Sequence, residues 1–496
     1  MLNINNNAAY TKHEILVQIA RLQLEGNLVD GVHYIPRKLA PVGSTPIRCC
    51  IYHDREILRQ RVVARLGCSL EDYNDDNTLA DYAKEALKRK KPTWPMLTVL
   101  HEACNACVRS HYMVTNACQG CFARPCMMNC PRKAIEVKQH ASIDSDKCVN
   151  CGLCMQNCPY HAIIKIPVPC EEACPVGAIS KDETGHERID YDKCIFCGNC
   201  MRECPFGAMM DKSQLVDVIA HIMKGKKKVV AMYAPAIAAQ FKAKPGQLEA
   251  ALIKAGFGRV WEVAIGADIC ADHEAKEFEQ RMKRGDKMMT TSCCSAYVRA
   301  VQIHVPALKP CVSETRSPMH YTAEIAKKAD PGCITVFIGP CLAKRREGFD
   351  DKMIDYVLSI EEVGALLVAK NIDIASLTAE PGSIIPTASG RNFATSGGVA
   401  EAVRVRLPDQ SILHSTVING LNKAGMATLN MYGKINSGAM PAPPNCPNLI
   451  EVMACEGGCI GGPSVVTNPK IAASLLKTYV AEGAVNTIEK KPEETK

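Results

Sequence analysis

The chain has 496 residues, of which 47% are hydrophobic and 22% are charged, and its formal net charge is +7. The length gives room for two to four domains, and the composition is ordinary for a soluble globular protein. No apolar run reaches the ~18 residues of a membrane span, and the N-terminus has no signal-peptide pattern. The sequence therefore predicts a cytoplasmic protein without a membrane span.

Cysteine is unusually frequent, with 28 residues. Because the cytoplasm keeps thiols reduced, this number predicts metal binding rather than disulfides. A [4Fe–4S] cluster on four thiolates carries about −2 when oxidised, so several clusters would cancel the excess positive charge. Nucleic acid is therefore not an expected partner. The basic runs at 87–92 and 224–228 are interpreted as solvated helix ends, with docking of an acidic redox partner as the alternative.

Residues 1–100 are predicted to form a small α-helical domain of unknown role. Apolar residues recur at the helical period over 54–67, where Asp54 is the predicted N-cap and Gly67 the predicted stop. A second helix is predicted over 79–91, where a proline follows.

Three residues of the same region have side chains that can bind metals: Cys49, Cys50 and His53. No matching cysteine pair lies near them in the sequence. We therefore favour a buried structural role over a ligand role for these residues.

Sixteen cysteines fall within 101–212, where the sequence signal is strongest. Two complete motifs have the spacing C-x2-C-x2-C-x3-C-P, and a third has one wider gap. In bacterial ferredoxins the first three cysteines of such a motif bind one [4Fe–4S] cluster, and the fourth crosses to the other cluster of a pair. The three motifs are Cys148, Cys151, Cys154 and Cys158; Cys194, Cys197, Cys200 and Cys204; and Cys118, Cys121, Cys126 and Cys130.

The stretch PCEEACP at 169–175 has only the second half of this motif, in Cys170 and Cys174. The crossing rule requires a first half, and Cys104-x2-Cys107 is the one unassigned C-x2-C pair in the chain. We therefore predict a split outer motif, with an inner two-cluster ferredoxin inserted at about 108–169. The four predicted sets are Cys104, Cys107, Cys170 and Cys204; Cys174, Cys194, Cys197 and Cys200; Cys118, Cys121, Cys126 and Cys158; and Cys130, Cys148, Cys151 and Cys154.

Two other interpretations of these cysteines stay open. Zinc ribbons fit less well, because zinc sites rarely have the third cysteine or the Cys-Pro fourth ligand. A degenerate repeat with three clusters would leave PCEEACP as a relic. Four clusters in one chain would form a wire that carries electrons to or from a reactive site.

The composition changes at Lys212, and residues 213–480 are predicted to form an α/β domain. Buried strands alternate there with helical stretches such as 271–282. The predicted strands lie within 227–239, 333–341 and 448–455. The polar tail at 481–496 is predicted to be disordered. The whole chain is thus expected to combine a helical domain, α+β ferredoxin-like modules and an α/β domain.

Three cysteine segments of the α/β domain are candidates for the reactive site. They are TTSCCSAYV (290–298), GPCLAKRRE (339–347) and EVMACEGGCIGGP (451–463). Two of them follow predicted strands, where ligand sites of α/β domains usually form. The glycines after Cys455 allow tight turns and close approach of the backbone to a cofactor.

In order, spacing and context these segments resemble the three motifs of [FeFe]-hydrogenases, and the resemblance extends over about 101–465. It implies an H-cluster, in which a [4Fe–4S] subcluster is bridged to a diiron unit with CO, CN⁻ and azadithiolate ligands. The implied cluster ligands are Cys294, Cys341, Cys455 and Cys459, the last as the bridging thiolate. Lys344 matches the family lysine that donates to a cyanide. Pro235, Phe393 and Met453 match other positions around the diiron unit.

The resemblance also implies a proton path along the stretch GADICADHEAKEFEQR at 266–281. Cys293 matches the proton-donor thiol, while Glu274 and Glu277 lie on one helical face. Ser313 matches the hydroxyl that links them. The implied order is Cys293, a water, Glu274, Ser313, Glu277 and solvent. Apart from the resemblance, each glutamate would be an ordinary surface residue.

A protein of this kind would cleave and form H2 reversibly and heterolytically. It would exchange electrons with a ferredoxin or a redox partner subunit, and it would depend on maturation proteins for the diiron unit. Two rivals remain: a non-catalytic relative for iron–sulfur assembly or scaffolding, and an H2 sensor. Cys293, Lys344 and both glutamates are all present, which favours the enzyme.

Several positions depart from the family pattern. Ser295 replaces the proline of the TSCCP motif, Gly339 replaces a methionine, and Ala236 replaces a serine. Groups around a metal site tune its properties, so these changes suggest a divergent branch that resembles the group B hydrogenases. They leave the rate, the oxygen sensitivity and the physiological direction open.

Overall fold

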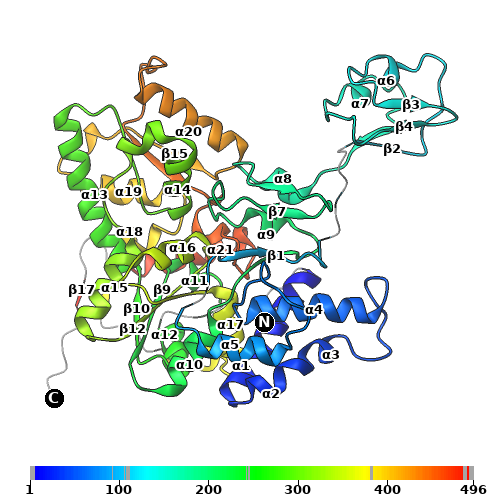
Figure 1. Cartoon of the computed structure of the whole chain (residues 1–496). Helices are drawn as coiled ribbons and strands as arrows, with labels where there is room; N and C mark the ends of the chain where they lie inside the picture. Colours follow the sequence, from blue (N-terminus) through cyan, green and yellow to red (C-terminus); the bar gives the residue numbers. More distant parts are fainter. Residues whose placement is uncertain are drawn as a thin grey trace.

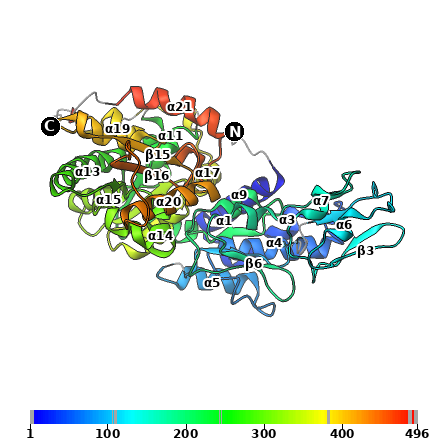
Figure 2. The same ribbon diagram turned by 90° about the horizontal axis from the view of Figure 1, so that it is seen from above.

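The computed structural model describes residues 6–91, 93–104, 107, 112–241, 243, 246–379, 384–483 and 489–490. Most of the chain forms one large body, and a small lobe stands apart from it (Figure 1). The second view again places α6, α7 and β3 of this lobe at one end of the molecule and α13 toward the other (Figure 2). Within the described part of the chain, no helix combines the length and the apolar character needed to cross a membrane.

The first hundred residues form helices, as the apolar periodicity predicts. They are α1 (Asn7–Leu24), α2 (Leu28–Gly31), η1 (Val32–Tyr34), α3 (Ile35–Leu39), α4 (Ile51–Arg65) and α5 (Leu79–Lys88). The predicted N-cap of α4 is wrong. The extended residue Cys50 is the N-cap, and Asp54 lies in the first turn, where its carboxylate accepts hydrogen bonds from the backbone N–H groups of Ile47 and Arg48. Gly67 has φ +82° just past the helix end, in agreement with its predicted role.

The cysteine-rich region is built from short antiparallel strand pairs and single-turn helices. An inner unit contains β2 (Tyr112–Val114) paired with β5 (Ile163–Lys165), β3 (Ile135–Val137) paired with β4 (Ala141–Ile143), α6 (Pro125–Met128) and α7 (Leu153–Gln156). An outer unit contains β1 (Leu97–Val99) paired with β8 (Met209–Asp211), β6 (Ile179–Lys181) paired with β7 (Glu187–Ile189), α8 (Pro169–Ala173) and α9 (Asn199–Glu203). In the sequence, β1 comes before and β8 comes after every other strand of this region. The inner unit is therefore inserted within the outer unit. The inner unit is the separate lobe of Figure 1.

The C-terminal half contains two parallel sheets. The first has the order β10 (Arg259–Glu262), β9 (Val229–Tyr233), β12 (Ile334–Gly339) and β13 (Tyr356–Ser359). The second has the order β11 (Met289–Thr290), β16 (Leu449–Met453) and β15 (Ser415–Asn419). The strand predicted over 227–239 is too long, because Pro235, which lacks an N–H, begins a short helix right after β9.

Helices surround these sheets in an alternating α/β order. They are α10 (Leu215–Lys224), α11 (Pro235–Ala238), α12 (Gln247–Lys254), α13 (Ala264–Arg284), α14 (Ser295–His304), η2 (Pro306–Cys311), α15 (Pro318–Ala329), α16 (Ala343–Asp350), α17 (Ile360–Ala369), η3 (Ile374–Ser376), α18 (Ala388–Asn392), α19 (Gly398–Arg404), η4 (Gln410–Ile412), α20 (Lys423–Asn436), η5 (Cys459–Gly461) and α21 (Pro469–Ala481). The tail predicted at 481–496 lies mostly outside the described residues. Within it, β17 (Glu489–Lys490) pairs with β14 (Ile384–Ile385).

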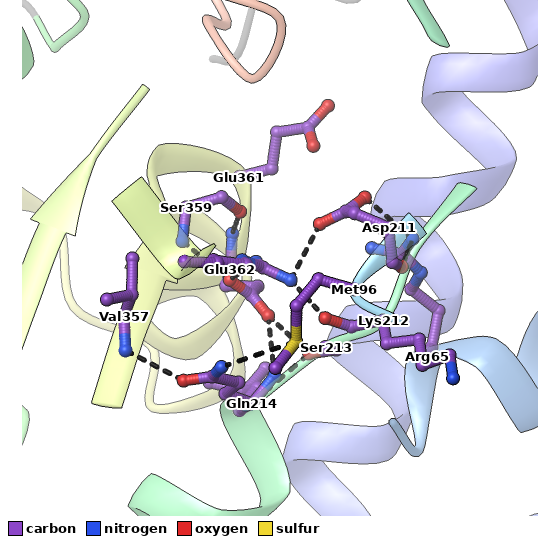
Figure 3. A network of polar contacts seen from close by, with 12 residues as sticks. Arg65, Met96, Asp211, Lys212, Ser213, Gln214, Val357, Ser359, Glu361 and Glu362 are labelled. Carbon is purple, nitrogen blue, oxygen red and sulfur yellow. Dashed lines mark hydrogen bonds and ion pairs between the residues drawn. The ribbon is translucent and has the colours of Figure 1, made fainter. Parts of the chain in front are cut away.

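A buried ion cluster joins the three parts of the molecule at Asp211, the last residue of β8 (Figure 3). Its carboxylate lies 3.2 Å from Lys12 Nζ of α1, 2.8 Å from an Arg65 nitrogen of α4 and 2.9 Å from an Arg345 nitrogen of α16. Burial opposes the charge of Asp211, but the three cations outweigh it and hold its pKa well below the usual range. Arg345 also pairs with the buried Glu362 of α17. The N-terminal helices are thereby attached to both other parts.

Candidate functional site

The three cysteine segments of the α/β half meet around one cavity of about 100 Å³. Each segment follows the carboxyl end of a parallel strand, namely β11, β12 and β16, and the two sheets direct these ends toward each other. The predicted site residues that line the cavity are Cys293, Cys294, Cys341, Cys455, Cys459, Lys344, Pro235, Phe393 and Met453. The structure therefore brings together every residue that was predicted to contact the cofactor.

Four of these thiols are close neighbours. Burial raises the pKa of the Cys455 thiol well above its usual value, and charge on Cys341, Cys294 and Cys459 raises it further. These four thiols come from three segments, and among the described residues no His, Asp or Glu side chain lines the cavity, so the four can form the donor set of a cubane iron–sulfur cluster. The predicted ligand residues thus fit the group, and their ligand role stays a prediction.

The rest of the cavity wall is almost entirely apolar, with side chains such as Ala236, Val263 and Phe337. The departure at Gly339 has a structural counterpart here. A Cβ at Gly339 would lie only 2.6 Å from the Phe337 ring, so this ring already occupies the space that a larger side chain would need. Gly458 has φ +89°, and a Cβ there would lie 2.5 Å from the carbonyl oxygen of Ala394, so the turn between two of the cysteines requires glycine.

Lys344 is the one cationic side chain on the cavity wall among the described residues. Its Nζ lies 2.6 Å from Glu347 Oε2, one turn further along α16. Burial opposes the charge of Lys344, but Glu347 outweighs it and raises the pKa of the lysine, which stays protonated. The hydroxyl groups of Ser295 and Ser317 also donate to Glu347.

Sequence reasoning did not single out Glu347. Its spacing from Lys344 in GPCLAKRRE places both on one face of a helix, and this was the available signal. Ser295 stands where the family motif has a proline, and its hydroxyl donates to Glu347. This hydrogen bond orients the Glu347 carboxylate that pairs with Lys344.

Glu274 of α13 is fully buried behind Cys293. One carboxylate oxygen accepts hydrogen bonds from the backbone N–H and the hydroxyl of Ser292, at 3.2 and 3.4 Å, and the other has no hydrogen-bond partner among the described residues. Burial raises the pKa of Glu274 to about 8. Burial and the charge of Glu274 also raise the pKa of Cys293.

Glu277 lies one turn further along α13 and is ionised. Burial opposes its charge, but hydrogen bonds from the Ser313 hydroxyl (2.6 Å) and the Glu314 N–H (3.0 Å), together with Arg281, lower its pKa. The predicted direct link between Ser313 and Glu274 is not formed. Glu274 instead contacts Ser292, whose hydroxyl lines a second, polar cavity of about 450 Å³.

That polar cavity also contacts Ser313, Thr315 and Glu347. Thr315 donates a 3.1 Å hydrogen bond to Glu277. Ser292 and Thr315 were missed from the sequence, because only the fold brings them between the two glutamates. Of the residues in the predicted chain only Ser313 lines this cavity, while Ser292 and Thr315, which also line it, contact Glu274 and Glu277.

The structure also groups the sixteen accessory cysteines. Burial raises the pKa of Cys170 to about 12, and charge on Glu187, Cys204 and Cys107 contributes. Burial likewise raises the pKa of Cys107, with Cys104 and Cys204 as neighbours. The four cysteines of the predicted set, Cys104, Cys107, Cys170 and Cys204, are therefore adjacent in space. We call these four the split set.

The other predicted sets show the same grouping. Burial and charge on Cys197, Cys194 and Cys174 raise the pKa of Cys200. In the inner unit, burial raises the pKa of Cys126, with charge on Cys158 and Cys121 adding to it. The remaining four enclose a small cavity, lined by Cys130, Cys148, Cys151 and Cys154.

The fourth cysteine of every motif accepts a hydrogen bond from the backbone N–H four residues later. The donors and acceptors are Ala134 and Cys130 (3.3 Å), Ala162 and Cys158 (3.4 Å), Ala178 and Cys174 (3.2 Å), and Ala208 and Cys204 (3.4 Å). Such bonds stabilise charge on a cluster sulfur. The repetition shows that all four motifs share one local fold, including PCEEACP.

One accessory set reaches the main cavity. Cys197 lines that cavity. Its charge also helps to raise the pKa of Cys455, although burial and the charges on Cys341, Cys294 and Cys459 have larger effects. A Cβ at Gly198 would lie 2.5 Å from Pro463, so the outer unit packs closely against the last cysteine segment. We call Cys174, Cys194, Cys197 and Cys200 the proximal set.

Comparisons with known proteins cover both halves of the molecule. Residues 227–463 match the family model described as "Iron only hydrogenase large subunit, C-terminal domain". Residues 141–164 and 187–210 match the "4Fe-4S binding domain" model.

The chain is 30% identical over 400 residues to the periplasmic [Fe] hydrogenase large subunit of Nitratidesulfovibrio vulgaris, covering 70% of this chain and 91% of that protein. It is 27% identical to iron hydrogenase 1 of Clostridium pasteurianum, covering 53% of this chain and 54% of that one. It is also 24% identical to the cytosolic Fe-S cluster assembly factor NAR1 of Eremothecium gossypii, covering 40% and 56%. The chain thus spans about half the length of the last two relatives.

Among solved structures, the chain is similar to a variant of the [FeFe]-hydrogenase HydA1 from Chlamydomonas reinhardtii. The TM-score is 0.44 and the identity 20%, covering 53% of this chain and 88% of that one.

Proposed function

We propose, from the premise that the chain belongs to the family of iron-only hydrogenase large subunits, that it catalyses the reversible heterolytic cleavage of H2. Family membership rests on 30% identity over 91% of a hydrogenase large subunit. The predicted resemblance to hydrogenases and the predicted ferredoxin-like modules are thereby confirmed. Catalytic activity is what we propose beyond family membership, because the relatives include both hydrogenases and a cluster assembly factor.

One observation carries the proposal: a fifth thiol, Cys293, lines the cavity beside the four ligand cysteines and adjoins the buried acid Glu274. A protein that only stores or transfers a cubane cluster needs four ligands. It has no use for a fifth thiol joined to a carboxyl group whose pKa is near neutral. Both are expected in a site that must move protons.

The residues of the cavity fit the H-cluster. Cys294, Cys341, Cys455 and Cys459 would hold the [4Fe–4S] subcluster, with Cys459 as the bridge to the diiron unit. When bound, the diiron unit supplies the metal chemistry that splits H2. Lys344 would donate a charge-assisted hydrogen bond to an anionic ligand of this group, and Glu347 positions the lysine.

The apolar wall has a separate task in this proposal. Pro235, Phe393 and Met453 would keep bulk water away from the reacting atoms. Polar interactions at the site are stronger in such a dry space.

Protons would leave the cavity through Cys293 and Glu274. Glu274 can both accept and release a proton near neutral pH, because burial raises its pKa to about 8. The Ser292 hydroxyl contacts Glu274 and lines the polar cavity, so it offers the exit toward water. Glu277, held ionised by Ser313 and Arg281, would attract the proton outward.

Electrons would pass through four accessory [4Fe–4S] clusters. The proximal set adjoins the main cavity, the split set lies next in the outer unit, and the two inner sets occupy the separate lobe. The inner lobe would receive a ferredoxin or a redox partner subunit, and separate maturation proteins would supply the diiron unit. The cytoplasmic location stays a prediction, because one relative is named as periplasmic.

An iron–sulfur assembly role is the second candidate, and similarity to the NAR1 assembly factor is the observation in its favour. An H2 sensor would have the same active site with slow turnover.

Anaerobic H2 uptake by the matured full chain, with an artificial electron acceptor, tests the proposal. The Cys293→Ala variant should lose at least about 100-fold of the rate, because it removes the first proton carrier. Its iron content should equal that of the wild type, since Cys293 is not a ligand. A wild-type protein with full cofactor and no H2 uptake would contradict the proposal.

A further inference from the structure

A cluster of metal-ligating side chains that contains no cysteine lies on the outer unit. His101 lies in the turn that follows β1, and Asp182 and His186 lie in the hairpin turn between β6 and β7. One ligand atom from each residue lies within 4.8 Å of the other two. The two segments are far apart in the sequence, so the fold creates this convergence.

The hairpin turn fixes Asp182 through one of its two oxygens. Oδ1 accepts hydrogen bonds from the backbone N–H of Thr184 (2.9 Å), the N–H of His186 (3.0 Å) and the Thr184 hydroxyl (2.6 Å). Among the described residues, none donates a hydrogen bond to Oδ2. The carboxylate is therefore held by the turn, and its second oxygen is left for a ligand.

The same hydroxyl selects the tautomer of His186. Thr184 Oγ1 lies 2.7 Å from His186 Nδ1 and gives its only proton to Asp182. Its oxygen must therefore accept the proton of Nδ1, which leaves a lone pair on Nε2. A histidine whose Nδ1–H is held in this way presents the form of the ring that binds metals.

His101 completes the group from the opposite segment. Its ring centroid lies 5.6 Å from that of His186, at an angle of 50°, so the two rings are not stacked. Within the described chain, neither nitrogen of His101 forms a hydrogen bond. The imidazole is therefore available to bind a shared ion.

We propose that His101, Asp182 and His186 bind a divalent transition-metal ion of the Zn²⁺ type, with water in the remaining positions. Two imidazoles and one carboxylate suit such ions, whereas Ca²⁺ and Mg²⁺ prefer oxygen ligands alone. The bound ion fastens the β6–β7 hairpin to the turn that precedes Cys104, whose N–H donates to the carbonyl of His101 at 3.0 Å. The inference does not rest on the hydrogenase activity.

Anaerobic equilibrium dialysis of the cluster-loaded full chain against Zn²⁺ tests the site. The wild type should bind one more zinc per chain than the His186→Ala variant. Asp182→Asn keeps the Oδ1 acceptor of the turn but replaces the free oxygen with an amide nitrogen, and it should bind this zinc at least about tenfold more weakly. His33→Ala, a change at an exposed histidine of the N-terminal domain, should bind as the wild type does.

Zinc X-ray absorption identifies the ligands independently. The spectrum should show nitrogen and oxygen neighbours at about 2.0–2.1 Å, with the scattering of two imidazoles. Sulfur neighbours at about 2.3 Å would mean that zinc had entered a cysteine set, and would overturn the proposal. Equal zinc binding by the wild type and His186→Ala would overturn it as well.

Discussion

At the scale of single residues, Glu274 has the most informative environment. It is fully buried, it receives hydrogen bonds from Ser292 alone among the described residues, and its pKa is raised to about 8. In the unfolded chain its pKa would return to the usual value of 4.5. The folded protein therefore binds a proton more tightly than the unfolded chain.

This shift predicts a stability that falls as pH rises. The contribution of Glu274 is complete below its unfolded pKa and is lost as pH rises through the folded pKa of about 8. Over that window the free energy of unfolding should fall by about 1.4 kcal/mol per pH unit from this group alone. The Glu274→Gln variant should lack this part of the slope. Anaerobic urea unfolding of both proteins at several pH values measures it, and parallel pH profiles would contradict the assignment.

The residues that line the main cavity were predictable one by one, because each lies in or near a short motif of the sequence. Cys294, Cys341, Cys455 and Cys459 and the residues matched to the pocket wall all meet at one cavity. Ser292, Thr315 and Glu347 were not predicted. The contacts of Ser292 and Thr315 with the two glutamates depend on how separate segments pack, which no sequence period encodes. For Glu347 the helical spacing from Lys344 was the one available signal, and its contact with Ser295 depends on packing as well.

At the scale of elements, α16 joins the main cavity to the domain junction. Lys344 points into the main cavity, and the next residue, Arg345, contacts Asp211 and Glu362 on the other side of the helix. The N-terminal helices contribute Lys12 and Arg65 to the same junction. Figure 3 shows Arg65 beside Asp211. The first hundred residues thus brace α16, the helix that carries Lys344.

Asp211→Asn should destabilise the whole protein strongly. The change leaves three cations around a neutral, buried side chain, and removal of one partner from a buried ion pair costs about 3–5 kcal/mol. Anaerobic urea unfolding measures this loss. The exposed pair of Lys328 and Glu324 on α15 is the matched control, and Glu324→Gln should leave the midpoint almost unchanged. Equal midpoints for Asp211→Asn and the wild type would show that the junction contributes nothing.

Element types were predicted better than element ends. The helices at 54–67 and 79–91 and the strands before Cys341 and Cys455 are present, because their apolar periods are clear. The errors fall at helix starts. The helix α4 begins at Ile51, directly after the extended N-cap residue Cys50, and so three residues before Asp54. The helix α11 begins at Pro235, inside an apolar run that the sequence makes look like one continuous strand.

At the scale of the whole molecule, the order of cysteines predicts a nested architecture. The strands β1 and β8 pair across the entire inserted unit, and the two halves of the split motif lie together. The attachment of the N-terminal helices was not predictable. It depends on ion pairs between residues more than 100 positions apart, which leave no pattern in the sequence.

Cys107→Ser should remove one accessory cluster and leave the others. The change takes one thiolate from the split set, so iron analysis should show a loss of about four iron atoms per chain. Cys446→Ser, at a half-buried cysteine outside every set, should retain the full iron content. Unchanged iron in Cys107→Ser would refute the split motif and make PCEEACP a relic.

The infrared spectrum of the matured protein tests the central claim most directly, because CO and CN⁻ ligands absorb where protein does not. A hydrogenase requires these bands, and they should persist in Cys107→Ser, since the split set does not hold the active-site group. An assembly protein with the same four cysteines would bind a cubane cluster alone. A wild-type spectrum without CO and CN⁻ bands after competent maturation would contradict the hydrogenase assignment.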